Sequence, residues 1–266
     1  MEKVISERQV FTPTVQGGVE FSHVQVLFQQ GNQFFLGHRH QRRCSAIDQS
    51  DLYNVVTISP DCYQPTLPPH TTLLHYTERP IYIKRPNLSN YTSPSSISVP
   101  LLREIEVCEV LLNNPHPNVA TYLGCKALGD RLDGICFELH PQNLMSMLNP
   151  GSLNKKELLE SRHCSLEVAE KYILGIEAGI RHLHSLGYVH NDINPMNIMI
   201  SGEGVPVIID FDSCVKVDES VENLKRTYGW YDKDEKLARE SNDLNALREI
   251  RAWLTGTSAD EFQYPI

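Results

Sequence analysis

The sequence predicts an α+β chain in two parts, a small β-rich part with one helix followed by an α-rich part. Short β-branched and aromatic runs recur between residues 52 and 138, with one stretch of helical periodicity among them. After residue 140 the strongest pattern is helical. With 266 residues, of which 41% are hydrophobic, the chain can bury a core and has the composition of a globular protein.

The composition indicates which classes of partner and which cellular compartment to expect. A net charge of -9 argues against a basic footprint, so we expect no nucleic-acid partner. The seven cysteines are scattered and never form a C-x-x-C pair, which indicates reduced core thiols, no zinc site and a cytoplasmic or nuclear location. No signal-like start and no run of about 20 apolar residues is present, so we expect no membrane partner.

The first part is predicted to contain one helix and several short strands. Residues 1 to 50 have a mixed pattern and are interpreted as an N-terminal extension of uncertain structure. Beyond them the pattern predicts strands at 54–58, 72–76 and 81–84, a mobile loop at 86–100, a helix at 101–112, and strands at 119–123 and 134–138. The helix is predicted from its apolar residues, which recur at spacings of three and four with glutamates between them: Leu101, Ile105, Cys108 and Leu112.

The second part has the clearest helix of the chain, at residues 166–186. Its apolar residues recur at helical spacing, and Gly187 follows as a stop signal. Short strands are predicted at 197–200 and 205–209, and a last amphipathic helix at 243–254. We therefore place domain boundaries at 51–139 and 140–266 after the extension.

The residues that carry chemistry lie between these last two strands. Asp192 is followed five positions later by Asn197, and Asp210 ends an apolar strand thirteen residues after that. A carboxylate, an amide and a second carboxylate in this order can place a base and two metal ligands around one phosphate.

These segments resemble the protein kinase family. Residues 190–197 match its catalytic loop H-R-D-L-x-x-x-N, and residues 210–212 match its metal motif D-F-G. The resemblance covers residues 52–254. Within the family, the sequence most resembles short fungal proteins with a kinase-like domain. It implies a two-lobed kinase-like fold with a β-rich N-lobe, a shortened α-rich C-lobe, and ATP as the cofactor. It also implies Asp192 as the catalytic residue and Asn197 and Asp210 as Mg²⁺ ligands.

The resemblance extends to both sides of this segment. Lys84 ends a strand as the phosphate-positioning lysine of kinases does, and Glu104 would pair with it. Glu106 or Glu109 would face Lys84 instead if the helix were rotated. Downstream, backbone groups of Glu138 and His140 would bind adenine with Phe137 as the gatekeeper. Asp243 resembles the aspartate that braces the catalytic loop.

The sequence departs from the kinase pattern at several positions. No glycine occurs in residues 59–71, where a phosphate-covering loop needs close backbone approach. Tyr82 stands where kinases carry a small alanine against adenine, Asn191 replaces an arginine, Asn194 replaces a lysine near the transferred phosphate, and Asp212 replaces the glycine of the metal motif. Ile266 comes only thirteen residues after Trp253, so we expect most helices of the peptide platform to be missing.

The sequence therefore predicts an ATP-dependent kinase-like phosphotransferase that acts on a hydroxyl, of the Ser/Thr type. Its acceptor, a protein or a small molecule, is not identified. Two alternatives stay open at this point. The missing glycines and Tyr82 favour a pseudokinase that serves as a binding or scaffold module. Asn194 and the short second part favour a small-molecule kinase of the aminoglycoside or choline kinase kind.

Overall fold

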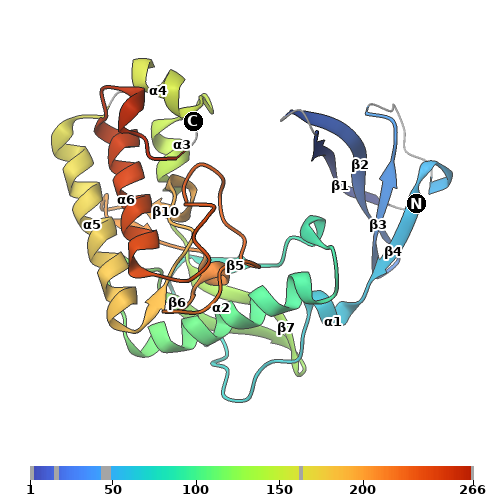
Figure 1. Cartoon of the computed structure of the whole chain (residues 1–266). Helices are drawn as coiled ribbons and strands as arrows, with labels where there is room; N and C mark the ends of the chain where they lie inside the picture. Colours follow the sequence, from blue (N-terminus) through green and yellow to red (C-terminus); the bar gives the residue numbers. More distant parts are fainter. Residues whose placement is uncertain (1–2, 15–17, 43–48, 162–163, 265–266) are drawn as a thin grey trace. The chain divides into compact units, whose positions relative to one another are not determined.

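The computed structural model describes residues 3–14, 18–42, 49–161 and 164–264. Figure 1 shows the chain coloured along its sequence. It divides into two compact units, of which the first comprises Met1–His70, Lys84–Leu102 and Lys126–Gly134, and the second comprises Thr71–Ile83, Arg103–Cys125 and Ile135–Ile266. Strands and helices are mixed along the chain, which agrees with the predicted α+β class. The predicted boundaries at residues 50 and 139 stay predictions.

The first unit is built on a four-stranded antiparallel sheet. Its strands are hydrogen-bonded in sequence order, namely β1 (Lys3–Pro13), β2 (Val19–Gln30), β3 (Gln33–Arg39) and β4 (Tyr53–Ile58). β4 matches the predicted strand at 54–58. The described residues before it were expected to be an extension of uncertain structure, and most of them form three regular strands instead.

Strand β2 explains why this sheet forms. Its side chains alternate between the two faces with the period of two that a strand imposes. Val24, Val26 and Phe28 form one buried cluster, and Leu27 belongs to the other. The second cluster also holds Leu36, Ile58, Cys62, Leu88 and Ile97, which come from β3, β4, the short helix α1 (Pro60–Tyr63), the 3₁₀ turn Leu88–Asn90 and the next helix.

Helix α2 (Ser95–Asn113) starts earlier than its apolar periodicity indicates. The segment 86–100 was predicted to be a mobile loop, and this is wrong for residues 95–100. Ser96 Oγ accepts hydrogen bonds from the Thr92 and Ser93 N–H groups, and Ile97 is buried in the cluster of the first unit. Burial of Ile97 thus extends the helix through a Ser- and Pro-rich stretch whose composition favours a loop.

A second sheet joins three strands in the order β5 (Ile81–Lys84), β7 (Arg131–Glu138) and β6 (Tyr122–Leu128). The predicted strand at 72–76 is not formed. In that segment Leu73 makes a single isolated bridge to Cys125. Gly124, with φ of 107°, allows this approach, because a Cβ there would lie 2.8 Å from the Leu73 carbonyl carbon.

The chain after residue 140 lies in the second unit and is mainly helical. Its helices are α3 (Leu144–Leu148), α4 (Lys155–Ser161), α5 (Leu166–Ser185) and α6 (Glu240–Thr255). Its short strands are β8 (Gln142–Asn143), β9 (Tyr188–Val189), β10 (Ile198–Ile200), β11 (Pro206–Ile208) and β12 (Val215–Lys216). Helix α5 packs against α6 and β11, and Figure 1 shows α5 and α6 side by side. The helices predicted at 166–186 and 243–254 are confirmed.

Five of the six described cysteines are buried, which agrees with core thiols, and Cys44 lies outside the described residues. None of the described helices combines the length and apolar character that crossing a bilayer requires.

Candidate functional site

The segment 190–197 connects β9 to β10 and is a loop whose polar side chains are buried. His190, Asn191, Asp192, Asn194 and Asn197 all have exposed fractions of 8% or less. Buried polar groups need hydrogen-bond partners, because an unsatisfied one costs about 1–3 kcal/mol. The contacts of this loop therefore determine where its functional groups lie.

Asp243, in the first turn of α6, holds the start of the loop. Its Oδ2 accepts a hydrogen bond from the His190 N–H and its Oδ1 accepts one from the Asn191 N–H, both at 2.8 Å. His184 Nε2, on α5, lies 2.8 Å from Asp243 Oδ2. Asn191 has φ of 62°, a conformation that asparagine tolerates better than most residues. The prediction that Asp243 braces this loop is confirmed.

Asp192 is held by its neighbours on both oxygens. Oδ1 accepts a hydrogen bond from the Thr227 N–H at 2.7 Å, and Oδ2 accepts one from Asn197 Nδ2 at 3.0 Å. Burial raises the pKa of the Asp192 carboxyl, although the Thr227 hydrogen bonds and the charges of His190 and Lys225 act in the other direction. The result is a fixed carboxylate with a raised affinity for a proton.

Asp210 follows β11 and lies close to the same loop. The adjacent Ile209 N–H donates to the Asn197 carbonyl at 3.0 Å, and the Ile209 carbonyl lies 3.0 Å from His190 Nε2. Asp210 itself has φ of 69°, in the left-handed region. The backbone thus brings Asp210 close to the loop that contains Asn197, and the joint role of the two as metal ligands stays a prediction. His190 thus links the start of the loop to the residue before Asp210.

Glu104, on α2, contacts the segment that begins at Asp210. Its side chain is buried, and Oε1 accepts a hydrogen bond from the Phe211 N–H at 3.1 Å. Of the alternative glutamates, Glu109 accepts hydrogen bonds from Thr72 and Tyr122, and Glu106 is exposed. Lys84 is the last residue of β5, as predicted. Its pairing with Glu104 stays a prediction.

Lys225 is a part of this site that sequence reasoning missed. Its Nζ lies 3.3 Å from Asp210 Oδ2 and 3.6 Å from Asp212 Oδ2. Burial lowers the pKa of the Lys225 ammonium, but Asp210, Asp212 and Asp192 raise it by more, so that the pKa lies above its ordinary value. Thr227, two residues on, was missed as well. No local pattern in the sequence distinguishes this segment from an ordinary polar loop.

The predicted adenine-binding residues follow β7. The Glu138 N–H donates to the Thr121 carbonyl, and the Glu138 side chain pairs with Arg79 at 2.8 Å. The Leu139 N–H donates to the Pro80 carbonyl at 2.9 Å. Within the described chain, His140 Nε2 is buried without a hydrogen-bond partner, and burial lowers the pKa of this ring. The adenine contacts of Glu138 and His140 stay predictions.

The segment 59–71, except for its last residue Thr71, lies in the first unit and runs beside β7. The Leu132 N–H donates to the Pro65 carbonyl, and the Leu67 N–H donates to the Asp130 carbonyl. Asp61, in the first turn of α1, pairs with Arg131 at 2.6 Å. The segment is therefore an ordered part of its own unit, built without glycine.

Comparison with known proteins agrees with this geometry. A family model described as the protein kinase domain matches residues 73–245, more than half of the chain. The chain belongs to the protein kinase family. The kinase-like fold predicted from the sequence is thereby confirmed. Protein kinase domains use ATP and a divalent metal in general.

Several curated kinases are similar to parts of this kinase chain. The MAP kinase kinase kinase SSK2 of Saccharomyces cerevisiae is 26% identical over 135 residues, which is 51% of this chain and 8% of that protein. The sensor for unfolded proteins in the ER ire1 of Schizosaccharomyces pombe is 28% identical over 180 residues, 60% of this chain and 15% of that protein. Mouse serine/threonine-protein kinase 16 is 39% identical over 56 residues, 20% of this chain and 18% of that protein. The alignments thus span less than a fifth of these relatives.

The residues of this kinase-family site fit a divalent metal that arrives with phosphates. Asn197 Nδ2 donates to both the carbonyl and the carboxylate of Asp192, so its amide oxygen is oriented to the other side. The Lys225 ammonium already lies against Asp210, which shows that this carboxylate attracts a cation. Nowhere in the described chain do three or more His, Cys, Asp or Glu residues form a metal cluster. Mg²⁺ needs only one or two carboxylates when phosphates and water complete its shell.

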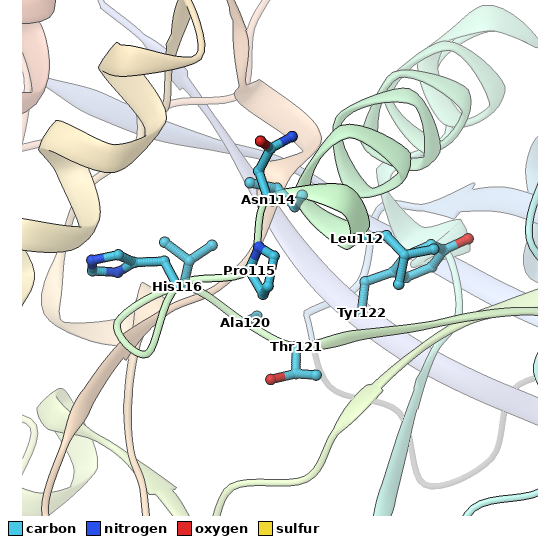
Figure 2. A pocket seen from close by; sticks show the side chains of 9 residues that line it. Leu112, Asn114, Pro115, His116, Ala120, Thr121 and Tyr122 are labelled. Carbon is cyan, nitrogen blue, oxygen red and sulfur yellow. The ribbon is translucent and has the colours of Figure 1, made fainter.

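A separate cavity of about 50 Å³ lies in the second unit between the end of α2 and the segment 114–122. Figure 2 shows Leu112, Pro115 and Tyr122 among the side chains that line it. This volume suits a few water molecules rather than a cofactor, because small-molecule sites occupy about 300–1,000 Å³. The cavity is not part of the candidate site.

Proposed function

We propose that this chain is a protein kinase that uses ATP and Mg²⁺ to phosphorylate a serine or threonine hydroxyl. The observation that carries the proposal is the buried Asp192 carboxylate, held by Thr227 and Asn197 in a loop that lies beside Asp210. The family membership and the similarity to serine/threonine kinases support it.

In the proposed reaction, Asp192 orients the acceptor hydroxyl and accepts its proton. The bond between the γ-phosphorus and the β,γ-bridging oxygen breaks, a bond between that phosphorus and the acceptor oxygen forms, and ADP leaves. A carboxyl whose pKa is raised by burial is a stronger base than an ordinary aspartate.

The other predicted site residues would bind the nucleotide. Lys84, steadied by Glu104, would contact the α- and β-phosphates, and backbone groups of Glu138 and His140 would contact adenine. Asn197 and Asp210 would hold Mg²⁺, which when bound neutralises negative charge on the phosphate oxygens.

A second candidate is a pseudokinase that binds partners without transferring phosphate. The absence of glycine from residues 59–71 and the presence of Pro65, Pro68 and Pro69 there favour it, because proline cannot donate a backbone hydrogen bond to phosphate.

Melting temperatures with and without ligand distinguish the two candidates. ATP at about 100 times its dissociation constant adds about 2.7 kcal/mol to the free energy of unfolding. Each kcal/mol raises the melting temperature of a chain of this size by roughly 2–4 °C. We expect this rise with ATP and Mg²⁺ together, and we expect Asp210→Asn to remove it. No rise under either condition would favour the pseudokinase.

The catalytic assignment is tested by Asp192→Asn, with the exposed Asp234→Asn as the matched control. Loss of the base should lower the transfer rate to serine- and threonine-containing peptides by roughly 10²–10⁴-fold, while ATP binding is retained. Equal rates in the two variants would contradict the role of Asp192.

A further inference from the structure

The ammonium group of Lys225 lies among carboxylates of the candidate site. Asp210 Oδ2 and Asp212 Oδ2 lie 3.3 and 3.6 Å from its Nζ. The Lys225 side chain as a whole is 57% exposed. The segment after β12 thus contributes a cation to the place where Asp192 and Asp210 would receive substrates.

The backbone around Lys225 is tied to this place on both sides. The buried Ser213 Oγ donates a hydrogen bond to the Lys225 carbonyl at 2.5 Å. Two residues later, the Thr227 N–H donates to Asp192 Oδ1. These contacts join the segment to the metal motif and to the catalytic loop, and they hold Lys225 between the two.

The catalytic loop supplies no permanent cation of its own, because residues 190–197 contain neither lysine nor arginine. Asn194 is fully buried, and its Nδ2 donates to the Asp192 carbonyl and to Thr227 Oγ1. A neutral amide held in this way cannot balance charge on a transferring phosphate.

Arg226, the next cation along the chain, is engaged elsewhere. Its guanidinium lies 4.1 Å from the centre of the Tyr231 ring, and it donates to the Asp232 carbonyl. Lys225 is therefore the cation of this segment that faces the carboxylates.

We propose that Lys225 binds the γ-phosphate of ATP and supplies the positive charge that Asn194 cannot. The inference rests on the proposed function, since it concerns the same reaction. In the structure the Lys225 ammonium pairs with Asp210 and Asp212. With ATP bound, Asp210 would hold Mg²⁺, and the flexible Lys225 side chain would contact phosphate oxygens. Asp212 and Ser213 are then positioning residues for Lys225.

The test compares nucleotides that differ by the γ-phosphate. Dissociation constants of Mg²⁺-ATP and Mg²⁺-ADP are measured by calorimetry on the full chain and on Lys225→Met, Lys225→Arg and the exposed control Lys216→Met. Loss of one charge-assisted hydrogen bond should weaken ATP binding by roughly tenfold or more in Lys225→Met and change ADP binding far less. Lys225→Arg should keep most of the preference for ATP, and Lys216→Met should equal the wild type.

The outcomes separate this inference from the proposed function. If the wild type transfers phosphate but Lys225→Met shows the wild-type ratio of ATP to ADP affinity, the inference is overturned and the proposed function stands. Tighter binding of both nucleotides in Lys225→Met would also overturn it, because Lys225 would then be only a counterion that competes with the metal. If the wild type binds neither nucleotide, both proposals fail. Because the side chain is about half exposed, Lys225→Met should fold, and Lys225→Gln gives a second neutral variant.

Discussion

The loop 190–197 and the segment 59–71 carry two halves of the predicted kinase chemistry, and they are built in opposite ways. The loop buries its polar side chains and connects them to α6 through Asp243. Within the segment only Cys62 and Pro65 are buried, and the segment contains four prolines and makes backbone hydrogen bonds to the β7 region of the first unit. The loop that carries the proposed base and metal ligands is held in place by buried hydrogen bonds, while the segment expected to cover the phosphates contains no glycine.

The two regions differ in what each needs in order to take part in the proposed reaction. A buried network requires every member, because each unsatisfied group costs free energy. A phosphate-covering loop requires backbone freedom and N–H donors instead, which prolines remove. We therefore expect substitutions in the loop 190–197 to lower the free energy of unfolding strongly and substitutions in the segment 59–71 to lower it little.

The largest effect is expected for Asp243→Ala. The substitution leaves the buried N–H groups of His190 and Asn191 without their acceptor, so the free energy of unfolding should fall by about 3–5 kcal/mol. The matched control is Asp61→Ala in the segment, where the exposed pair with Arg131 should contribute about 0–1 kcal/mol. Urea denaturation measures both, and equal losses would refute the comparison.

A smaller loss of stability is expected when Pro68 and Pro69 are both replaced by alanine. Each change should lower the free energy of unfolding by about 0.4–1 kcal/mol, because the unfolded chain gains freedom. Calorimetry should show unchanged affinity for Mg²⁺-ATP if the segment does not touch the phosphates. A change of affinity of tenfold or more would mean that it covers the nucleotide after all.

The smallest effect concerns the pH dependence of stability at Asp133. Burial raises the pKa of this carboxyl, but Lys126 and Arg85 lower it by more, so its folded-state pKa lies below the ordinary value of 3.8. Its contribution to stability is thus present above that value and is lost as the pH falls through the lowered pKa. Both partners are about half exposed.

Asp133→Asn should therefore destabilise the protein by less than about 1 kcal/mol at pH 7 and by nothing at strongly acidic pH. Unfolding curves between pH 2 and pH 7 measure the difference, with Asp234→Asn as the control. A deficit that persisted unchanged at the acidic end would show that the contribution does not come from the ion pairs.

Much of the second unit could be predicted from the sequence, since its signals are local. The helices α5 and α6 have strong apolar periodicity, and the motifs around Asp192 and Asp210 lie at fixed spacings. The strands β1 to β3 escaped prediction because polar and apolar residues mix in them, so their burial depends on contacts with one another and with Leu88 and Ile97. The early start of α2 depends on the same contacts.

The sequence by itself determined the order of the chemical groups: a lysine at the end of a strand, a glutamate in a helix, then Asp192, Asn197 and Asp210. Only the tertiary structure decided which other residues meet them. Thr227 and Lys225 reach the site because hydrogen bonds from Thr227 to Asp192 and from Ser213 to Lys225 join segments distant in the chain. Such contacts leave no periodic trace in a sequence, since they depend on where the backbone returns and not on the residues beside it.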